Sequence, residues 1–221
     1  MELPLFAGFL FTTILTAIAF WLSIRLVARY RKEKIRSTIL LACFALFMGS
    51  AYFIGSLLYF FSPSLRGIMV EVGTIFLALS ALAMAFFIIE VSIENRKAKL
   101  TGWTLVLLAS AVYIVIVLAN PPIPPIIVGE DWTFPSIVFY STLLAVAPLA
   151  LLTSLLFFRC SFGVGAGELK KKGMCLAIGF LIEAIFMYTI DLSGLFSQQL
   201  WMWRMFESIG MLLILHGLGY K

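Results

Sequence analysis

Apolar segments of roughly 20 residues recur along the chain and are separated by short polar stretches. A helix of about 20 residues, rising 1.5 Å per residue, matches the roughly 30 Å hydrocarbon core of a bilayer, whereas barrel strands are about half as long and alternate in polarity. Backbone groups in lipid need internal hydrogen-bond partners, which a helix supplies. We therefore predict one domain (residues 1–221) of seven transmembrane helices, at about residues 5–28, 38–61, 67–90, 101–119, 134–158, 173–194 and 199–218.

The composition supports this interpretation. Hydrophobic residues make up 62% of the chain and charged residues 12%, with a mean hydropathy of +1.08. Soluble domains are about half apolar and a quarter charged, and a domain of this length cannot bury so much apolar surface in water. We expect an all-α integral membrane protein, a seven-helix bundle that is multi-pass in the plasma membrane and contacts membrane lipid.

Basic residues lie almost entirely on one side of the predicted bundle. The first, third and fifth connections and the C-terminus contain Arg29, Arg31, Lys32, Lys34, Arg36, Arg96, Lys97, Lys99, Arg159, Lys170, Lys171, Lys172 and Lys221. The other side has only Arg66. The positive-inside rule then predicts an outer N-terminus and a cytoplasmic C-terminus. The net charge of +5 is thus explained by topology and anionic lipid, and we expect no nucleic-acid partner.

Ionisable side chains at membrane depth are the most informative candidates for function, because each costs roughly 2.5–3.5 kcal/mol on insertion scales and normally faces the bundle interior. The predicted buried polar or ligand-binding network consists of Glu71, Glu183, Tyr188, Asp191, Arg204 and Glu207, with Tyr52, Tyr59 and Ser193 as further hydroxyls. Arg204 and Glu207 are three residues apart and share a helix face. One arginine faces up to four carboxylates, so Glu183, near mid-membrane, is a candidate to carry a proton. The alternative role is an ion-pair network that fixes helix register.

Catalytic and cofactor motifs are missing from the sequence. His216 is the only histidine, which excludes bis-histidine haem and multi-histidine zinc sites, and there is no GxSG or GK[ST] motif. We expect a non-enzymatic protein without cofactor or metal. The three cysteines are expected to be free thiols in a reducing compartment.

Three further features have structural interpretations. The proline-rich segment 120–132 is expected to form a stiff cover on the outer surface, and Pro148 is expected to kink the fifth helix. Small residues in the second and third predicted helices indicate close helix contacts or a seam between copies in a homo-oligomer. These residues are Gly49, Ala51, Gly55, Ala78, Ala81 and Ala85.

The helix number and orientation, with the segment from Glu207 to His216, resemble the microbial rhodopsins. All eight lysines lie in loops or at the terminus, and Ser208 stands near the retinal lysine's place, so the resemblance implies a bundle shape without a photoactive retinal. In helix number, basic inner loops and composition the chain also resembles the seven-helix sensor region of prokaryotic histidine kinases. No kinase domain follows in this sequence.

Three functions are consistent with these observations. We expect a receptor- or sensor-like protein that binds a small or amphipathic ligand, or a partner membrane protein, in the outer half between the third, sixth and seventh helices. The alternative is a small transporter, proton-coupled through Glu183 or Glu207. A structural subunit of a larger membrane complex is the third.

Overall fold

A computed structural model describes residues 3–58, 60, 63–121, 135–145, 147–163, 167–186 and 200–218. Within these residues the chain is all-helical, with eight helices and no strand. The helices are α1 (Leu3–Glu33), α2 (Arg36–Leu57), α3 (Pro63–Ser92), α4 (Arg96–Ala119), α5 (Ser136–Ala145), α6 (Ala147–Gly163), α7 (Glu168–Ile185) and α8 (Leu200–Gly217). The predicted cover, residues 120–132, lies almost wholly outside the described residues.

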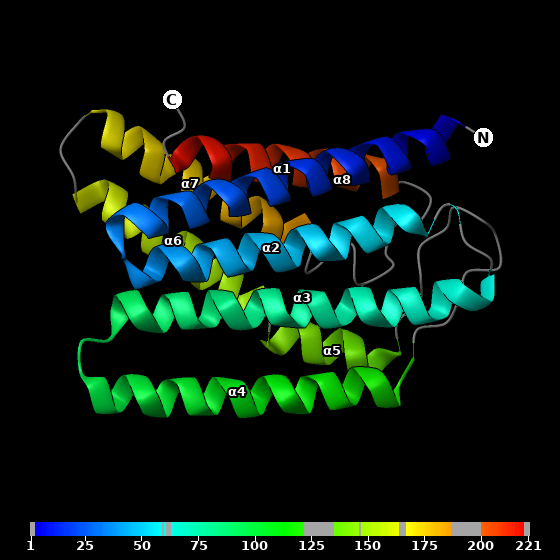
Figure 1. Cartoon of the computed structure of the whole chain (residues 1–221), viewed down its shortest axis with the longest axis horizontal. Helices are drawn as coiled ribbons and strands as arrows, with labels where there is room; N and C mark the ends of the chain where they lie inside the picture. The colour runs from blue at the N-terminus through cyan, green and yellow to red at the C-terminus, as the bar shows by residue number, and fades with distance from the viewer. Residues whose placement is uncertain are drawn as a thin grey trace.

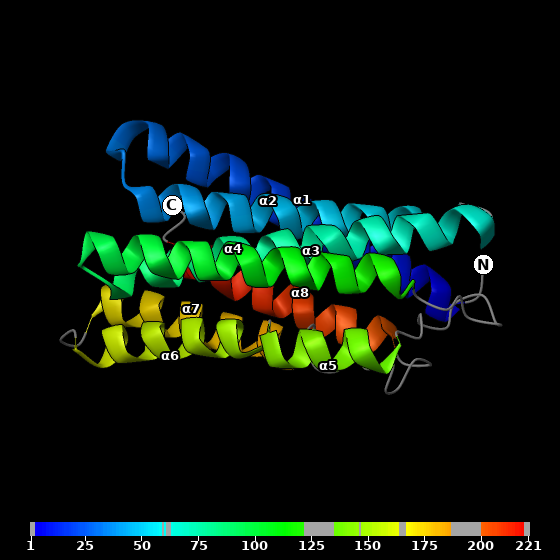
Figure 2. The same cartoon turned by 90° about the horizontal axis from the view of Figure 1, so that it is seen from below.

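Six of the helices form a closed ring. α1 packs against α2, α2 against α3, α3 against α6, α6 against α7, α7 against α8, and α8 returns to α1. α4 lies outside this ring against α3 and α5, and Figures 1 and 2 show all the helices running along a common direction. The ring places α2, α7 and α8 around a shared interior.

The fifth predicted helix corresponds to α5 and α6. α5 ends at Ala145 and α6 begins at Ala147, immediately before Pro148, and residue 146 lies outside the described residues. Proline has no backbone N–H, and its ring clashes with the carbonyl four residues earlier, which is why a kink is expected at Pro148. This kink stays a prediction.

Several helices are suited to a bilayer in both length and composition. Among the described residues, four helices are long and apolar enough to cross a membrane: Phe6–Glu33, Arg36–Leu57, Leu65–Ser92 and Arg96–Ala119; α6 is apolar but shorter. On α4 the large apolar side chains are exposed around the helix: Leu100, Leu105, Leu107, Leu108, Val112, Val115 and Leu118. Glu183 and Glu207, by contrast, are fully buried. Apolar groups outside and carboxylates inside are the distribution of a membrane-embedded protein.

The basic residues gather at one end of the molecule. The C-terminal ends of α1, α3, α6 and α8 and the N-terminal ends of α2, α4 and α7 all lie at the left of Figure 1, a region that we call the basic end. α1 stops there because Lys34 adopts a left-handed conformation (φ 57°), which turns the chain toward α2. At the α3–α4 turn, Asn95 caps α4 and Lys99 forms an ion pair of 3.3 Å with Glu90.

Small residues set the distances between neighbouring helices, as the sequence predicted for α2 and α3. Gly49 faces Ala19 and Phe20 of α1, and a Cβ there would lie 3.0 Å from the Phe20 ring. Ala78, Ala81 and Ala85 are buried within the chain. The contacts are therefore made inside one copy. The three cysteines are free, as predicted.

α7 and α8 approach closely through three glycines that we call the glycine seam: Gly179, Gly210 and Gly217. A Cβ on Gly179 would lie 2.7 Å from Ile214 Cγ1 and 2.8 Å from the Gly210 carbonyl oxygen. A Cβ on Gly217 would lie 2.7 Å from the Lys172 carbonyl oxygen. Because backbone atoms occupy this space, only glycine fits without moving one helix.

We expect Gly179→Ala to lower the stability of the protein by about 1–3 kcal/mol, because the added methyl group overpacks the seam. Gly67→Ala on α3 is the matched control, since no atom lies within 4 Å of its added Cβ, and alanine is favoured over glycine in helices by about 0.5–1 kcal/mol. Thermal unfolding in detergent micelles measures both. Equal effects of the two substitutions would contradict the close approach of α7 and α8.

Candidate functional site: buried carboxylates and an arginine between α2, α7 and α8

Two fully buried carboxylates lie along the glycine seam. Glu183 is in the last turn of α7, and a Cβ on Gly210 of α8 would lie 2.9 Å from Glu183 Oε1. Glu207 is one helical turn before Gly210 on α8 and is also 0% exposed. The absence of a side chain at Gly210 thus gives Glu183 its place against the backbone of α8.

Arg204 supplies a positive charge beside these carboxylates. Its Nη1 donates a hydrogen bond of 2.8 Å to Glu207 Oε2, and only 16% of the arginine side chain is exposed. The spacing of three residues puts both groups on one face of α8, as predicted from the sequence. A charge-assisted bond of this length is strong when it is shielded from water.

Tyr52 of α2 joins the two halves of the site. Its hydroxyl donates to Glu183 Oε2 at 3.4 Å, and the guanidinium carbon of Arg204 lies 5.6 Å from the centre of its ring. A cation over a tyrosine face is attracted by the ring quadrupole. We call these four residues, Tyr52, Glu183, Arg204 and Glu207, the acid–arginine site.

Aromatic side chains pack beside the site where α7 ends. Phe186, the C-cap residue of α7, stacks on Trp203 and Phe206 of α8 with ring centroids 5.7 Å and 4.7 Å away. The Ser208 hydroxyl donates to the Arg204 carbonyl oxygen within α8. These contacts fix the first half of α8, which carries both members of the ion pair.

The structure brings together only some of the candidates chosen from the sequence. Glu183, Arg204 and Glu207 lie in one site, and Tyr52 is the hydroxyl that reaches it. Glu71 on α3 is half-buried and forms no hydrogen bond or ion pair with a described residue. Tyr188, Asp191, Tyr59 and Ser193 lie outside the described residues. Among the described residues the site therefore draws on α2, α7 and α8, and the contribution expected from the third helix stays a prediction.

The glycine seam was missed in the sequence, although it determines the geometry of the site. Gly210 follows Glu207 by three residues, and Gly217 follows Gly210 by seven. Glycines on one helix face at these spacings are typical of close helix packing in membranes, so this signal was present. Pairing them with Gly179 required the observed register of α7 on α8.

The arrangement has the chemistry of a polar binding or proton-carrying site. Two carboxylates and one guanidinium leave the four residues with an excess of acidic groups. Carboxylate oxygens accept hydrogen bonds from ammonium or hydroxyl groups, and carboxyl groups held inside a membrane bundle commonly mark ligand sites or proton pathways. Within the part of the chain that the structure describes, no group of three histidine, cysteine or acidic residues is placed to hold a metal ion.

Comparisons of the chain with protein-family models, curated proteins and solved structures find no match. The fold and the site therefore define the protein by class alone. It is an all-helical, membrane-embedded protein with an ion pair and a second carboxylate in its interior.

We expect Glu207→Leu to destabilise the protein by about 3–5 kcal/mol, because it leaves the Arg204 charge in a largely buried position. The double variant Arg204→Met/Glu207→Leu should recover most of this loss, since apolar side chains of similar size replace both charges. Thermal unfolding of the single variants Arg204→Met and Glu207→Leu and of the double variant gives the coupling free energy between the two residues.

The ion pair of Arg29 with Glu33 is the control for this cycle. It has a similar length, 2.9 Å, but its side chains are 53% and 37% exposed. Its coupling should not exceed about 1 kcal/mol, because water and entropy offset an exposed pair. A coupling at Arg204 and Glu207 as small as that at the control pair would show that burial adds nothing to the interaction.

Proposed function

We propose that this chain is a non-enzymatic, receptor- or sensor-like membrane protein with seven transmembrane helices. Its acid–arginine site would bind a small or amphipathic ligand, or a polar group on a partner membrane helix. The observation that carries this proposal is the burial of Glu183 and Glu207 beside Arg204, in a bundle whose other fully buried side chains, among the described residues, are uncharged. Charged groups at such depth are costly and commonly mark a ligand or ion site.

The count of seven is supported by the lengths of the helices. α5 has 10 residues and spans about 15 Å, which is half of a bilayer core, so α5 and α6 together make one crossing. α7 and α8 have 18 residues each and reach about 27 Å, close to the hydrocarbon thickness. The gathering of basic residues at one end supports the orientation with that end in the cytoplasm.

The site's position on α7 and α8 supports a receptor. It lies in the last turns of α7 and the first turns of α8, whereas the other ends of both helices reach the basic end. A ligand that changes the hydrogen bonds of Glu183 or Arg204 would act on two helices that continue to the cytoplasmic surface. A ligand of this kind shifts the protein by its difference in affinity for two arrangements of the helices.

A small proton-coupled transporter is the second candidate. The hydrogen bond from the Tyr52 hydroxyl to Glu183 favours it, because a buried carboxyl group beside a hydroxyl is a common element of proton pathways. Transport requires this carboxyl group to face the two sides of the membrane in turn.

For the receptor, we expect a ligand found by screening small amines and amphiphiles to raise the unfolding temperature of the purified protein. Binding at a free concentration 100 times Kd adds about 2.7 kcal/mol of stability. Glu183→Gln and Arg204→Met/Glu207→Leu should abolish this shift, because they remove the groups that contact the ligand. The measurement is thermal unfolding in lipid nanodiscs.

Glu94→Gln is the matched control, since it removes one carboxylate at an exposed position near the basic end. It should keep the full ligand-induced shift. If a compound stabilises the control and the site variants equally, it binds elsewhere, and the acid–arginine site is not its receptor.

For the transporter, we expect proteoliposomes with a pH-sensitive dye inside to show solute-driven proton movement that Glu183→Gln abolishes. Tyr52→Phe should slow the movement, because it removes the hydrogen bond and keeps the ring beside Arg204. Proton movement that persists in Glu183→Gln, or that no gradient produces in the natural protein, would exclude coupling through this carboxyl group.

A further inference from the structure

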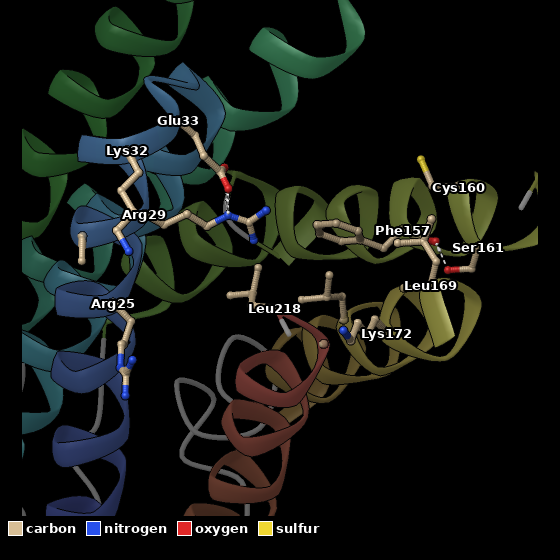
Figure 3. A pocket seen from close by; sticks show the side chains of 14 residues that line it. Arg25, Arg29, Lys32, Glu33, Phe157, Cys160, Ser161, Leu169, Lys172 and Leu218 are labelled. Carbon is tan, nitrogen blue, oxygen red and sulfur yellow. Dashed lines mark hydrogen bonds and ion pairs between the residues drawn. The ribbon is translucent and has the colours of Figure 1, made fainter. Parts of the chain in front are cut away.

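A second polar feature of the protein is a cavity of about 820 Å³ at the basic end. It lies between the C-terminal part of α1 and the facing ends of α6, α7 and α8 (Figure 3). In Figure 3, the side chain of Arg29 extends from α1 toward α6 and α7, with Lys172 of α7 on the opposite wall. The acid–arginine site belongs to the other ends of α7 and α8, so the two features are separate.

The walls of the cavity are strongly positive. Four basic residues line it, Arg25, Arg29, Lys32 and Lys172, together with one acidic residue, Glu33. Two of the cations form ion pairs of 2.9 Å along their own helices, Arg29 with Glu33 and Lys172 with Glu168. The hydrogen bond from Lys172, and then the charge of that lysine, lower the pKa of the Glu168 carboxyl group. Exposed pairs of this kind are weak and can be exchanged for a stronger anion.

Apolar side chains line the rest of the cavity. They include Phe157 of α6, Leu169 and Leu176 of α7, and Leu218 after α8. A cavity with cations on two walls and leucines and a phenylalanine between them matches a molecule with an anionic head and a hydrocarbon tail. A small hydrated anion would use only the cations.

The position of the cavity brings it close to molecules of this kind. At the level of the cavity, α1 ends at Glu33 and α2 begins at Arg36, and both helices can cross a bilayer. Lipid headgroups therefore lie beside the cavity when the bundle is in a membrane. Anionic lipids attract basic segments there, and each lysine or arginine near the surface raises the affinity roughly fivefold. Pockets between transmembrane helices are known to hold such headgroups.

We propose that this cavity is a binding site for one anionic phospholipid, with its phosphate between Arg29 and Lys172 and an acyl chain against Leu169 and Leu218. Glu33 competes with the phosphate for Arg29. The site is independent of the proposed receptor or transporter function, because it uses none of the residues of the acid–arginine site.

The test is a titration of the full-length protein in neutral detergent with phosphatidylglycerol, followed by native mass spectrometry. Arg29→Gln/Lys172→Gln should weaken binding roughly tenfold or more relative to the charge-matched control Arg36→Gln/Lys97→Gln. The control cations are exposed near the same end and do not line the cavity. Equal losses in the two double variants would overturn the proposal in favour of unspecific attraction, and so would no loss in either.

The second arm of the test looks for a gain of affinity, because misfolding cannot produce one. Glu33→Gln should bind phosphatidylglycerol severalfold more tightly than the natural protein, whereas Glu94→Gln, which removes the same charge outside the cavity, should not. A failure of Glu33→Gln to exceed Glu94→Gln would contradict the competition for Arg29 and the proposed position of the phosphate.

The third arm separates the lipid from free phosphate and reads out the cavity directly. Cys160 is exposed and lines the cavity, so bound phosphatidylglycerol should slow its alkylation, measured by peptide mass spectrometry. Phosphatidylcholine and water-soluble glycerol phosphate at the same concentrations should leave the rate unchanged. Equal protection by glycerol phosphate would assign the site to a free phosphate, and protection by phosphatidylcholine would show that the charge is irrelevant; either result overturns the proposal.

Discussion

The contact between α7 and α8 governs the polar interior of this protein. Three glycines, Gly179, Gly210 and Gly217, bring the backbones of the two helices together, and the same approach places Glu183 against α8. A carboxylate inside a membrane bundle needs hydrogen-bond donors or cations at fixed positions, because no water compensates for a misplaced group. Close backbone packing provides this precision. The ion pair of Arg204 with Glu207 and the contact with Tyr52 both lie within the space that it defines.

The distribution of charge along the chain follows from the lipid that surrounds the bundle. Exposed leucines and valines cover α4, the helix outside the ring, whereas the carboxylates of Glu183 and Glu207 are hidden. Most other charges lie at helix ends, where headgroups and water solvate them. The bundle therefore has two polar regions of opposite character: an interior one with excess acid, and a cavity at the basic end lined by four cations.

The sequence predicted the helical class and most helix positions because each depends on local pattern. Runs of apolar residues define α1 to α4 without reference to their neighbours. The pairing of Arg204 with Glu207 was also predictable, since both lie on one helix face. The contribution of Tyr52 was harder to predict because it depends on the closure of the ring, which brings a side chain of α2 across the interior to Glu183 of α7. The cavity at the basic end has no local signal at all: its walls come from four helices.

The glycine seam has a mechanical consequence. Side chains normally absorb small displacements between helices by changing rotamers, but a contact of backbone on backbone has none to change. α7 and α8 are held in this way from Gly210, beside the buried carboxylate, to Gly217, beside the cavity. We therefore expect the two helices to shift as one unit over the length of the seam, so that a displacement beside the buried carboxylate is carried to the wall of the cavity.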